Sequence, residues 1–220
     1  KRMDQKLNEK YGKMIETLKK IRVVPVVKIN DPKDAVPLGK ALMAGGLPCA
    51  EITFRTAAAE EAIASLSREL PELIVGAGTV LTPEQADAAL KAGASFIVSP
   101  GFNPRVVDHC ISIGVPIFPG INNPTGIEMA LERDLPAVKF FPAEASGGLA
   151  MLKAMAAPYT DILFMPTGGI NAKNIASYLE FPRVLACGGS WMVGADMIAA
   201  GDFDSITSLT KEALKSAGAL

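Results

Sequence analysis

One lysine lies inside an otherwise apolar run, Ala137-Val138-Lys139-Phe140-Phe141-Pro142. Burial disfavours the charged form of a lysine, and a neutral amine is a nucleophile toward ketones. Lys139 is therefore a candidate for Schiff-base chemistry. The structural alternative is a side chain that snorkels to solvent from a strand end. Lys28 is a weaker candidate, because Asn30-Asp31-Pro32 follows it and predicts a solvated turn.

A second polar group occurs in Glu51-Ile52-Thr53-Phe54-Arg55. In a strand, side chains alternate between faces, so Glu51, Thr53 and Arg55 share one face. A carboxylate there could transfer protons, and an arginine could bind a substrate carboxylate through two parallel hydrogen bonds. The structural alternative is an ion pair between Glu51 and Arg55.

Two glycine pairs occur in Thr167-Gly168-Gly169-Ile170 and Gly188-Gly189-Ser190. Glycine lets backbone N–H groups approach an anion closely, and a helix N-terminus adds a favourable dipole. One pair alone would be equally typical of a tight turn. Two pairs at the ends of consecutive predicted strands indicate a phosphate site.

Metal-binding patterns are not apparent. His109 is the only histidine and lies in 104–113, which reads as an outer helix. Three widely spaced cysteines, Cys49, Cys110 and Cys187, lack metal-type spacing and read as reduced thiols. We expect neither a metal nor another cofactor.

The elements that position these residues alternate regularly from residue 23 onward. Segments with helical periodicity, such as 34–44, 59–70 and 83–92, separate eight short runs rich in β-branched residues. The runs are Val23–Ile29, Cys49–Phe54, Ile74–Val80, Ser95–Pro100, Pro116–Ile121, Ala137–Pro142, Ile162–Gly169 and Val184–Trp191. This pattern predicts an α/β fold, a (β/α)8 TIM barrel. An open doubly wound sheet would also alternate, but no Gly-rich turn follows the first run.

We expect one domain over residues 1–220, with an additional amphipathic helix in 1–22 and the barrel in 23–220. In such barrels the active site lies at the carboxyl ends of the strands. Polar residues at the predicted ends are Glu51, Thr53, Arg55, Thr79, Ser99, Lys139, Thr167 and Ser190. Pro100 follows one of these ends and is expected to line the pocket.

Composition narrows the class of protein. The chain of 220 residues is 49% hydrophobic but only 6% aromatic, as expected for an aliphatic core between helices and a parallel sheet. Its formal net charge is −1, without long runs of either sign, which argues against nucleic acid and anionic membranes as partners. Neither a signal peptide nor a membrane-spanning stretch is apparent, so we expect a cytoplasmic protein.

Seven motifs together resemble the 2-keto-3-deoxy-6-phosphogluconate and 4-hydroxy-2-oxoglutarate aldolase family. The resemblance runs from about Val23 to the C-terminus. The motifs are Val24-Pro25-Val26, Glu51-Ile52-Thr53-Phe54-Arg55-Thr56, Val75-Gly76-Ala77-Gly78-Thr79-Val80, Val98-Ser99-Pro100-Gly101, Lys139-Phe140-Phe141-Pro142-Ala143-Glu144, Pro166-Thr167-Gly168-Gly169 and Gly188-Gly189-Ser190-Trp191. The loops containing Asn103-Pro104 and Asn122-Asn123-Pro124 vary from the family pattern, which bears on the distal end of the substrate.

The resemblance implies roles for individual residues. Lys139 matches the Schiff-base lysine, and Glu51 matches the proton-transferring glutamate. The remaining matches are Arg55 and Thr79 for the substrate carboxylate, Gly168, Gly169, Gly189 and Ser190 for the phosphate, with Thr167 beside them, and Pro100 and Phe141 for the pocket wall.

The implied activity is that of a class I aldolase acting on a small phosphorylated keto acid. The resemblance also implies a cytoplasmic homotrimer without a metal. An aldolase for the galactonate epimer and a phosphate-binding isomerase or epimerase without a covalent lysine are alternatives. A catalytically dead barrel is a further alternative, but it predicts an eroded pocket, whereas Glu51, Arg55, Thr79 and Lys139 are all present.

Overall fold

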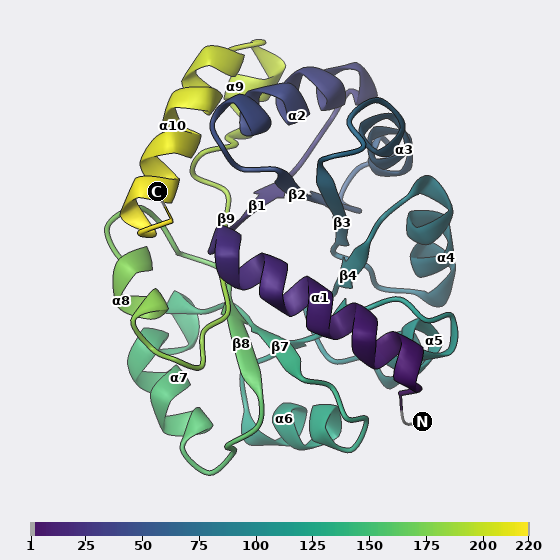
Figure 1. Ribbon diagram of the computed structural model, residues 1–220, viewed down its shortest axis with the longest axis vertical. Helices are drawn as coiled ribbons and strands as arrows, with labels where there is room; N and C mark the ends of the chain where they lie inside the picture. Colours follow the sequence, from purple (N-terminus) through teal and green to yellow (C-terminus); the bar gives the residue numbers. More distant parts are fainter. Residues whose placement is uncertain (1–2, 220) are drawn as a thin grey trace.

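The computed structural model describes residues 3–219 and has an α/β architecture with parallel strands. Helices lie around the outside of the strands (Figure 1). The strands are β1 (Val23–Val27), β2 (Cys49–Thr53), β3 (Ile74–Gly78), β4 (Phe96–Val98), β5 (Ile117–Phe118), β6 (Gly120–Ile121), β7 (Ala137–Phe140), β8 (Leu163–Pro166) and β9 (Cys187–Gly189). Each of the eight predicted runs therefore contains a strand, and the fifth run contains two.

The helices separate the strands, as the periodicity predicts. They are α1 (Gln5–Ile21), α2 (Ala35–Ala44), α3 (Ala59–Glu69), α4 (Pro83–Ala92), α5 (Pro104–Ser112), α6 (Pro124–Leu131), α7 (Gly148–Ala156), α8 (Ile175–Leu179), α9 (Ala195–Ala199) and α10 (Phe203–Ser216), with 3-10 turns η1 (Pro32–Asp34) and η2 (Glu144–Ser146). The Thr82 side chain caps α4 by accepting a hydrogen bond from the Gln85 N–H group. Gly93 ends α4 in the left-handed conformation that favours glycine.

The strands form two sheets. One has the order β5-β4-β3-β2-β1-β9, and the other has the order β6-β7-β8. The sheets adjoin at Pro119, between β5 and β6, where the Pro119 carbonyl accepts a hydrogen bond from the Lys139 N–H group. They adjoin again through parallel bridges from Phe164 to Val184 and from Thr167 to Gly188. All carboxyl strand ends consequently point in one direction, because every pairing is parallel.

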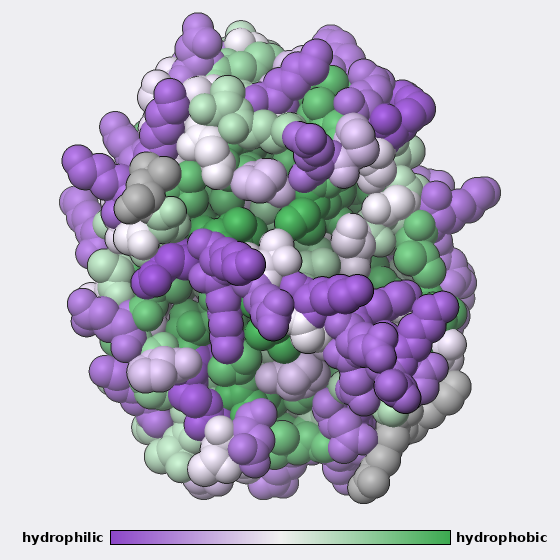
Figure 2. All heavy atoms as spheres, viewed as in Figure 1, coloured by the Kyte–Doolittle hydropathy of each residue, from purple (hydrophilic) through white to green (hydrophobic). Residues whose placement is uncertain are grey.

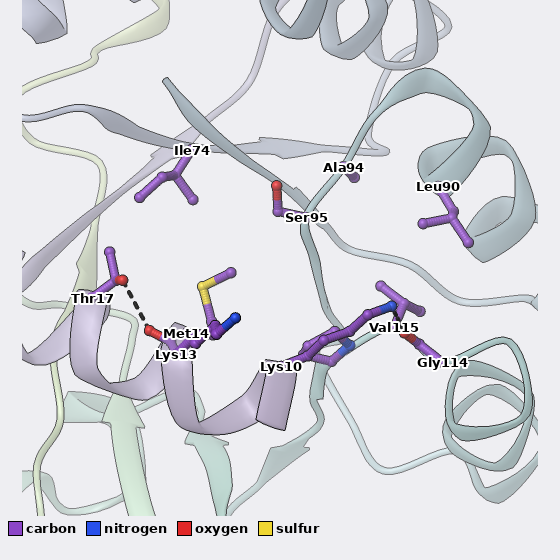
Figure 3. A pocket seen from close by; sticks show the side chains of 11 residues that line it. Lys10, Lys13, Met14, Thr17, Ile74, Leu90, Ala94, Ser95, Gly114 and Val115 are labelled. Atoms are coloured by element: carbon purple, nitrogen blue, oxygen red, sulfur yellow. Dashed lines mark hydrogen bonds between the residues drawn. The ribbon is translucent and has the colours of Figure 1, made fainter. Parts of the chain in front are cut away.

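Helix α1 lies across the amino-terminal ends of β3, β4 and β5. Leu7, Tyr11 and Leu18 are its buried residues, and the Tyr11 hydroxyl donates to the Ile117 carbonyl and accepts from the Ile117 N–H group, at 2.8 and 2.7 Å. Hydrophilic side chains cover its outer face (Figure 2). Beneath it, residues such as Met14, Ile74 and Val115 line a hollow of about 420 Å³ (Figure 3). The helix thus covers the strand ends opposite the predicted site.

Candidate active site

Lys139 and Glu51 meet inside the fold, although they lie on different sheets. The central strand β7 carries Lys139, whose neighbours across the sheet are Gly120 and Met165. Strand β2 carries Glu51, opposite Val26 and Gly76. The Nζ atom of Lys139 lies 3.9 Å from Oε1 of Glu51, and the two residues are 5% and 0% exposed. The candidate nucleophile and the candidate proton acceptor therefore lie in contact and are both buried.

The carboxylate of Glu51 has no hydrogen-bond partner among the described residues, although both oxygens are buried. Burial raises the pKa of Glu51, while the charges of Lys139 and Arg55 act in the opposite direction. Burial is the larger effect on the pKa of Glu51, because removing a carboxyl group from water disfavours its charged form. A group with unsatisfied oxygens and a raised pKa is well suited to take up and return a proton.

Phe141 contacts Lys139 and also lines a hollow beyond the strand ends. The Phe141 ring centroid lies 4.8 Å from Nζ of Lys139. Phe141 and Pro100, the two predicted wall residues, line a hollow of about 620 Å³ together with Asn122 and Asn123. The hollow lies beyond the ends of β4, β6 and β7, and Lys139 and Glu51 are not among the residues that line it. The asparagines belong to the loop in which the sequence departs from the family pattern.

Arg55 contacts Thr53, with which the alternation predicts it to share a face, but its side chain is exposed. Strand β2 ends at Thr53, and Arg55 is exposed beyond it. Its Nε donates a 3.0 Å hydrogen bond to the Thr53 hydroxyl, which donates in turn to the Val27 carbonyl. Among the described residues the ion pair of Glu51 is with Lys139, not with Arg55. Leaving the strand frees the guanidinium for solvent or a ligand.

Thr79 occupies an unusual backbone conformation immediately after β3. Its φ is 56°, in the left-handed region that β-branched residues rarely adopt. The residue is half-buried, and its hydroxyl makes no hydrogen bond to another described residue. Backbone outliers of this kind concentrate at ligand sites, where surrounding structure holds them in place. Thr79 therefore remains a candidate ligand contact at the expected strand end.

The first glycine pair forms a turn after β8. Gly168 and Gly169 have φ values of 99° and 80°, a region that glycine enters without steric cost. The N–H groups of Gly169 and Ile170 take no part in the backbone hydrogen bonds of the described residues. A Cβ atom on Gly168 would lie 3.4 Å from the Phe141 ring, so the turn adjoins the lysine strand. Unpaired N–H groups in such turns form anion-binding concavities.

The second glycine pair brings β9 close to this turn. A Cβ atom on Gly188 would lie 2.4 Å from the hydroxyl of Thr167, which is buried. A Cβ atom on Gly189 would lie 1.9 Å from the Trp191 ring. Ser190 follows β9 and is exposed. The glycines therefore allow Thr167 and Trp191 to pack directly on the backbone that precedes Ser190.

Other residues singled out in the sequence lie away from this group. Lys28 is exposed, as expected, and His109 on α5 contacts Asp87 on α4 at 2.8 Å. The Ser99 hydroxyl donates to the Gly101 carbonyl. Within residues 3–219, no group of three or more His, Cys, Asp or Glu side chains is arranged to hold a metal ion. No helix in that range is long and apolar enough to cross a membrane.

Several residues at the site were missed in the sequence. Trp191, to which we assigned no role from the sequence, is half-buried, packs against the core and lies over Gly189. The amide side chains of Asn171 and Asn174 both donate to the Gly169 carbonyl. Their nearness to the Gly-Gly pair was a signal, but only the backbone conformation shows which carbonyl they bind.

Known proteins are similar to this chain in both sequence and fold. The family model described as "Aldolase: KDPG and KHG aldolase" matches residues 14–209. A 2-dehydro-3-deoxy-phosphogluconate aldolase of Treponema pallidum is 56% identical over 207 residues, covering 94% of this chain and 99% of that protein.

Two solved structures extend the comparison. The 2-keto-3-deoxy-6-phosphogluconate aldolase of Zymomonas mobilis ZM4, solved with 3-phosphoglycerate, is 42% identical with a TM-score of 0.85, over 90% of this chain and 94% of that one. The KDPG aldolase of Legionella pneumophila, in which pyruvate was captured as a covalent carbinolamine, is 38% identical with a TM-score of 0.86, over 90% and 96% of the two chains. From its sequence and fold together, this chain belongs to the KDPG and KHG aldolase family.

Proposed function

We propose that this protein is a class I aldolase that cleaves 2-keto-3-deoxy-6-phosphogluconate to pyruvate and D-glyceraldehyde 3-phosphate. The observation that carries the proposal is the buried pair of Lys139 and Glu51, 3.9 Å apart, in which both carboxylate oxygens lack a hydrogen-bond partner within the described residues. An isomerase without a covalent intermediate would have no need for the buried lysine. The family resemblance also supports 4-hydroxy-2-oxoglutarate as a second substrate, cleaved to pyruvate and glyoxylate.

The first steps form the imine. The neutral amine of Lys139 attacks the C2 carbonyl carbon of the substrate and gives a carbinolamine. Loss of water gives a protonated imine, whose positive charge makes it an electron sink. Glu51 is close enough to exchange protons with the nitrogen or with a water between them. The carbinolamine in the Legionella pneumophila relative is the corresponding first intermediate.

The next steps break and restore bonds at C3. Glu51 takes the proton from the C4 hydroxyl, directly or through water, as the electrons of the C3–C4 bond move into the iminium. D-glyceraldehyde 3-phosphate leaves, and an enamine of pyruvate remains on Lys139. Glu51 returns its proton to C3, and water then hydrolyses the imine to release pyruvate. Burial keeps Glu51 able to alternate between its two protonation states.

The ends of the substrate are assigned to separate parts of the site. Arg55 and Thr79 bind the carboxylate at the ends of β2 and β3, because the guanidinium and the hydroxyl are available there. Gly168, Gly169, Gly189 and Ser190 bind the phosphate, with Thr167 supporting them from β8. Pro100 and Phe141 form the wall between the two ends.

We also infer that the two sheets belong to one closed barrel with eight strand positions, β5 and β6 sharing one of them. The hydrogen bond of the Lys139 N–H group to Pro119 and the bridges from β8 toward β9 support closure on both sides. The family resemblance supports a single domain that assembles as a cytoplasmic homotrimer. Buried free thiols at Cys49, Cys110 and Cys187 are consistent with a reducing compartment. Sedimentation velocity tests the assembly.

Borohydride trapping tests the covalent step. The protein is incubated with pyruvate, reduced, digested and mapped by mass spectrometry, and we expect the adduct on Lys139. The Lys139→Met variant should form no adduct and show no turnover, while methionine remains compatible with its apolar strand. Lys28→Met is the matched control, because Lys28 is exposed on the same chain.

Two outcomes of this experiment separate the class I aldolase from the isomerase. An adduct on Lys139 supports the class I mechanism. Folded protein without an adduct would overturn it and favour the isomerase. Comparing the gluconate-derived substrate with its galactonate epimer then determines which C4 configuration is preferred.

A further inference from the structure

Resting on the proposed function, we propose that Glu144 and Tyr178 are positioning residues for the phosphate subsite. Together they would set how strongly the enzyme prefers phosphorylated over unphosphorylated keto acids. Glu144 follows the lysine strand in the motif Lys139-Phe140-Phe141-Pro142-Ala143-Glu144, and Tyr178 lies on α8. Neither is needed for the chemistry at C2, C3 or C4.

Both carbonyl groups of the Gly168-Gly169 turn accept hydrogen bonds. The Glu144 N–H group donates to the Gly168 carbonyl at 3.1 Å. The side-chain amides of Asn174 and Asn171 donate to the Gly169 carbonyl at 3.0 and 3.2 Å. In a planar trans peptide the N–H group points away from the preceding carbonyl. Fixing the Gly168 carbonyl therefore orients the Gly169 N–H group, and fixing the Gly169 carbonyl orients that of Ile170.

Neither of these two N–H groups makes a backbone hydrogen bond among the described residues. The hydrogen bonds to the two carbonyls thus fix the direction of both N–H donors. Pre-oriented donors bind an anion more strongly than mobile ones, because less conformational freedom is lost on binding.

The Glu144 side chain fixes the backbone that makes the first of these contacts. Its Cγ lies 2.6 Å from the position that a Cβ atom on Gly169 would occupy, so the side chain lies flat against the turn. Its Oε1 accepts a hydrogen bond from the hydroxyl of Tyr178. Tyr178 as a whole residue is 2% exposed. A Cβ atom on Gly148 would come within 3.1 Å of Oε1 and 3.4 Å of the Tyr178 oxygen, so this glycine also leaves room for the pair.

The hydroxyl of Tyr178 also fixes the position of the negatively charged Glu144 side chain. By binding Oε1, it holds the carboxylate in one place beside the turn. Without the hydroxyl, the side chain of Glu144 gains freedom to approach a bound phosphate, which it would repel. Tyr178→Phe should therefore weaken phosphate binding in two ways, through a less ordered turn and through a mobile like charge.

The test compares two substrates and a phosphate-bearing probe. Titration calorimetry with 3-phosphoglycerate should show about 3- to 10-fold weaker binding to Tyr178→Phe than to wild type, the range expected for losing one hydrogen bond. KM for 2-keto-3-deoxy-6-phosphogluconate should rise by a similar factor, with kcat nearly unchanged. Kinetics with 4-hydroxy-2-oxoglutarate, which lacks a phosphate, and borohydride trapping of pyruvate should not change.

Two further variants identify the cause. Glu144→Gln keeps the packing and a hydrogen-bond acceptor but removes the charge, so the Tyr178→Phe/Glu144→Gln double variant should recover part of the lost affinity. Tyr159→Phe is the matched control, because the Tyr159 hydroxyl donates to Glu128 at 2.9 Å on an exposed surface. It should bind 3-phosphoglycerate as wild type does.

Each outcome decides between the assignments. A loss confined to the phosphorylated ligands supports the positioning role. Equal losses with both substrates, or none, would overturn it while leaving the proposed aldolase intact. Wild-type protein that traps pyruvate but does not distinguish the two substrates would likewise overturn this inference alone. Wild-type protein that cleaves neither substrate and forms no adduct would overturn the proposed function and this inference together.

Discussion

Gly78 lies directly against the carboxylate of Glu51: a Cβ atom on Gly78 would come within 2.1 Å of Oε1. The contact follows from strand register. Glu51 on β2 pairs with Gly76 on β3, so Gly78 lies two residues farther along β3 on the same face, diagonally across from Glu51. Position 78 therefore controls the place of the acid–base group without taking part in proton transfer. The absence of a side chain there is a requirement of the site.

Gly78→Ala should lower kcat while both Lys139 and Glu51 remain present. The new methyl group displaces the Glu51 carboxylate, and a shift of about 1 Å can cost up to about 100-fold in rate. Steady-state kinetics measure the loss, and borohydride trapping shows whether Lys139 still reacts. Gly12→Ala is the control, because a Cβ atom there meets nothing within 4 Å. Normal kcat in folded Gly78→Ala would contradict this placement of Glu51.

Glu51→Gln should slow turnover by about 10²–10⁴-fold, the usual contribution of a positioned proton-transfer group. The amide keeps the shape of the side chain but cannot accept the C4 hydroxyl proton. Trapping with pyruvate should remain partly intact, because the lysine is unchanged. Glu60→Gln, on the exposed surface of α3, controls for the change in net charge. Near wild-type cleavage by Glu51→Gln would exclude the proposed role.

Glu51 should also make stability depend on pH. Burial raises the pKa of Glu51 in the native state above its ordinary value of 4.5. Between about 4.5 and the raised pKa, the native state therefore holds a proton that the unfolded chain has lost. The contribution of Glu51 to the free energy of unfolding must fall as pH rises through this window, and it vanishes below it.

Urea unfolding of wild type and Glu51→Gln over a pH series measures this contribution. We expect Glu51→Gln to gain stability relative to wild type as the pH increases, because glutamine does not ionise. Lys139 and Arg55 reduce the effect by stabilising the carboxylate. Parallel stability curves for the two proteins would show that burial does not dominate the pKa of Glu51.

Tyr11→Phe should destabilise the protein without changing the chemistry. The Tyr11 hydroxyl satisfies both the N–H and the C=O group of Ile117, and all three groups are buried. Leaving buried polar groups without partners costs about 1–3 kcal/mol. Urea unfolding should show this loss, whereas Tyr159→Phe should show little change because its hydroxyl lies on an exposed surface. Unchanged stability would mean that water replaces the Tyr11 hydroxyl.

Periodicity and residue type determined the order of the elements. Parallel strands buried on both faces must be short and aliphatic, and the helices between them must be amphipathic, so both patterns are visible in a single sequence. The division of the fifth run at Pro119 was not visible, because it depends on which strand pairs on each side. Lys139 was identifiable because a charged residue in an apolar run conflicts with its surroundings.

The tertiary structure decided which of these residues meet. The sequence does not show that Glu51 contacts Lys139 and Gly78, because these residues are far apart in the chain. The contact with Lys139 depends on how the two sheets face each other, and the contact with Gly78 depends on the register of β2 and β3. Period two predicted that Arg55 shares a face with Glu51 and Thr53, and Arg55 does contact Thr53. Its side chain is exposed, however, because the strand ends at Thr53. The pairing of Glu144 with Tyr178 depends on how α8 packs beside the glycine turn. Sequence alone thus proposed the candidate reactive groups, whereas the distance between them and the raised pKa of Glu51 come from packing, which no local pattern encodes.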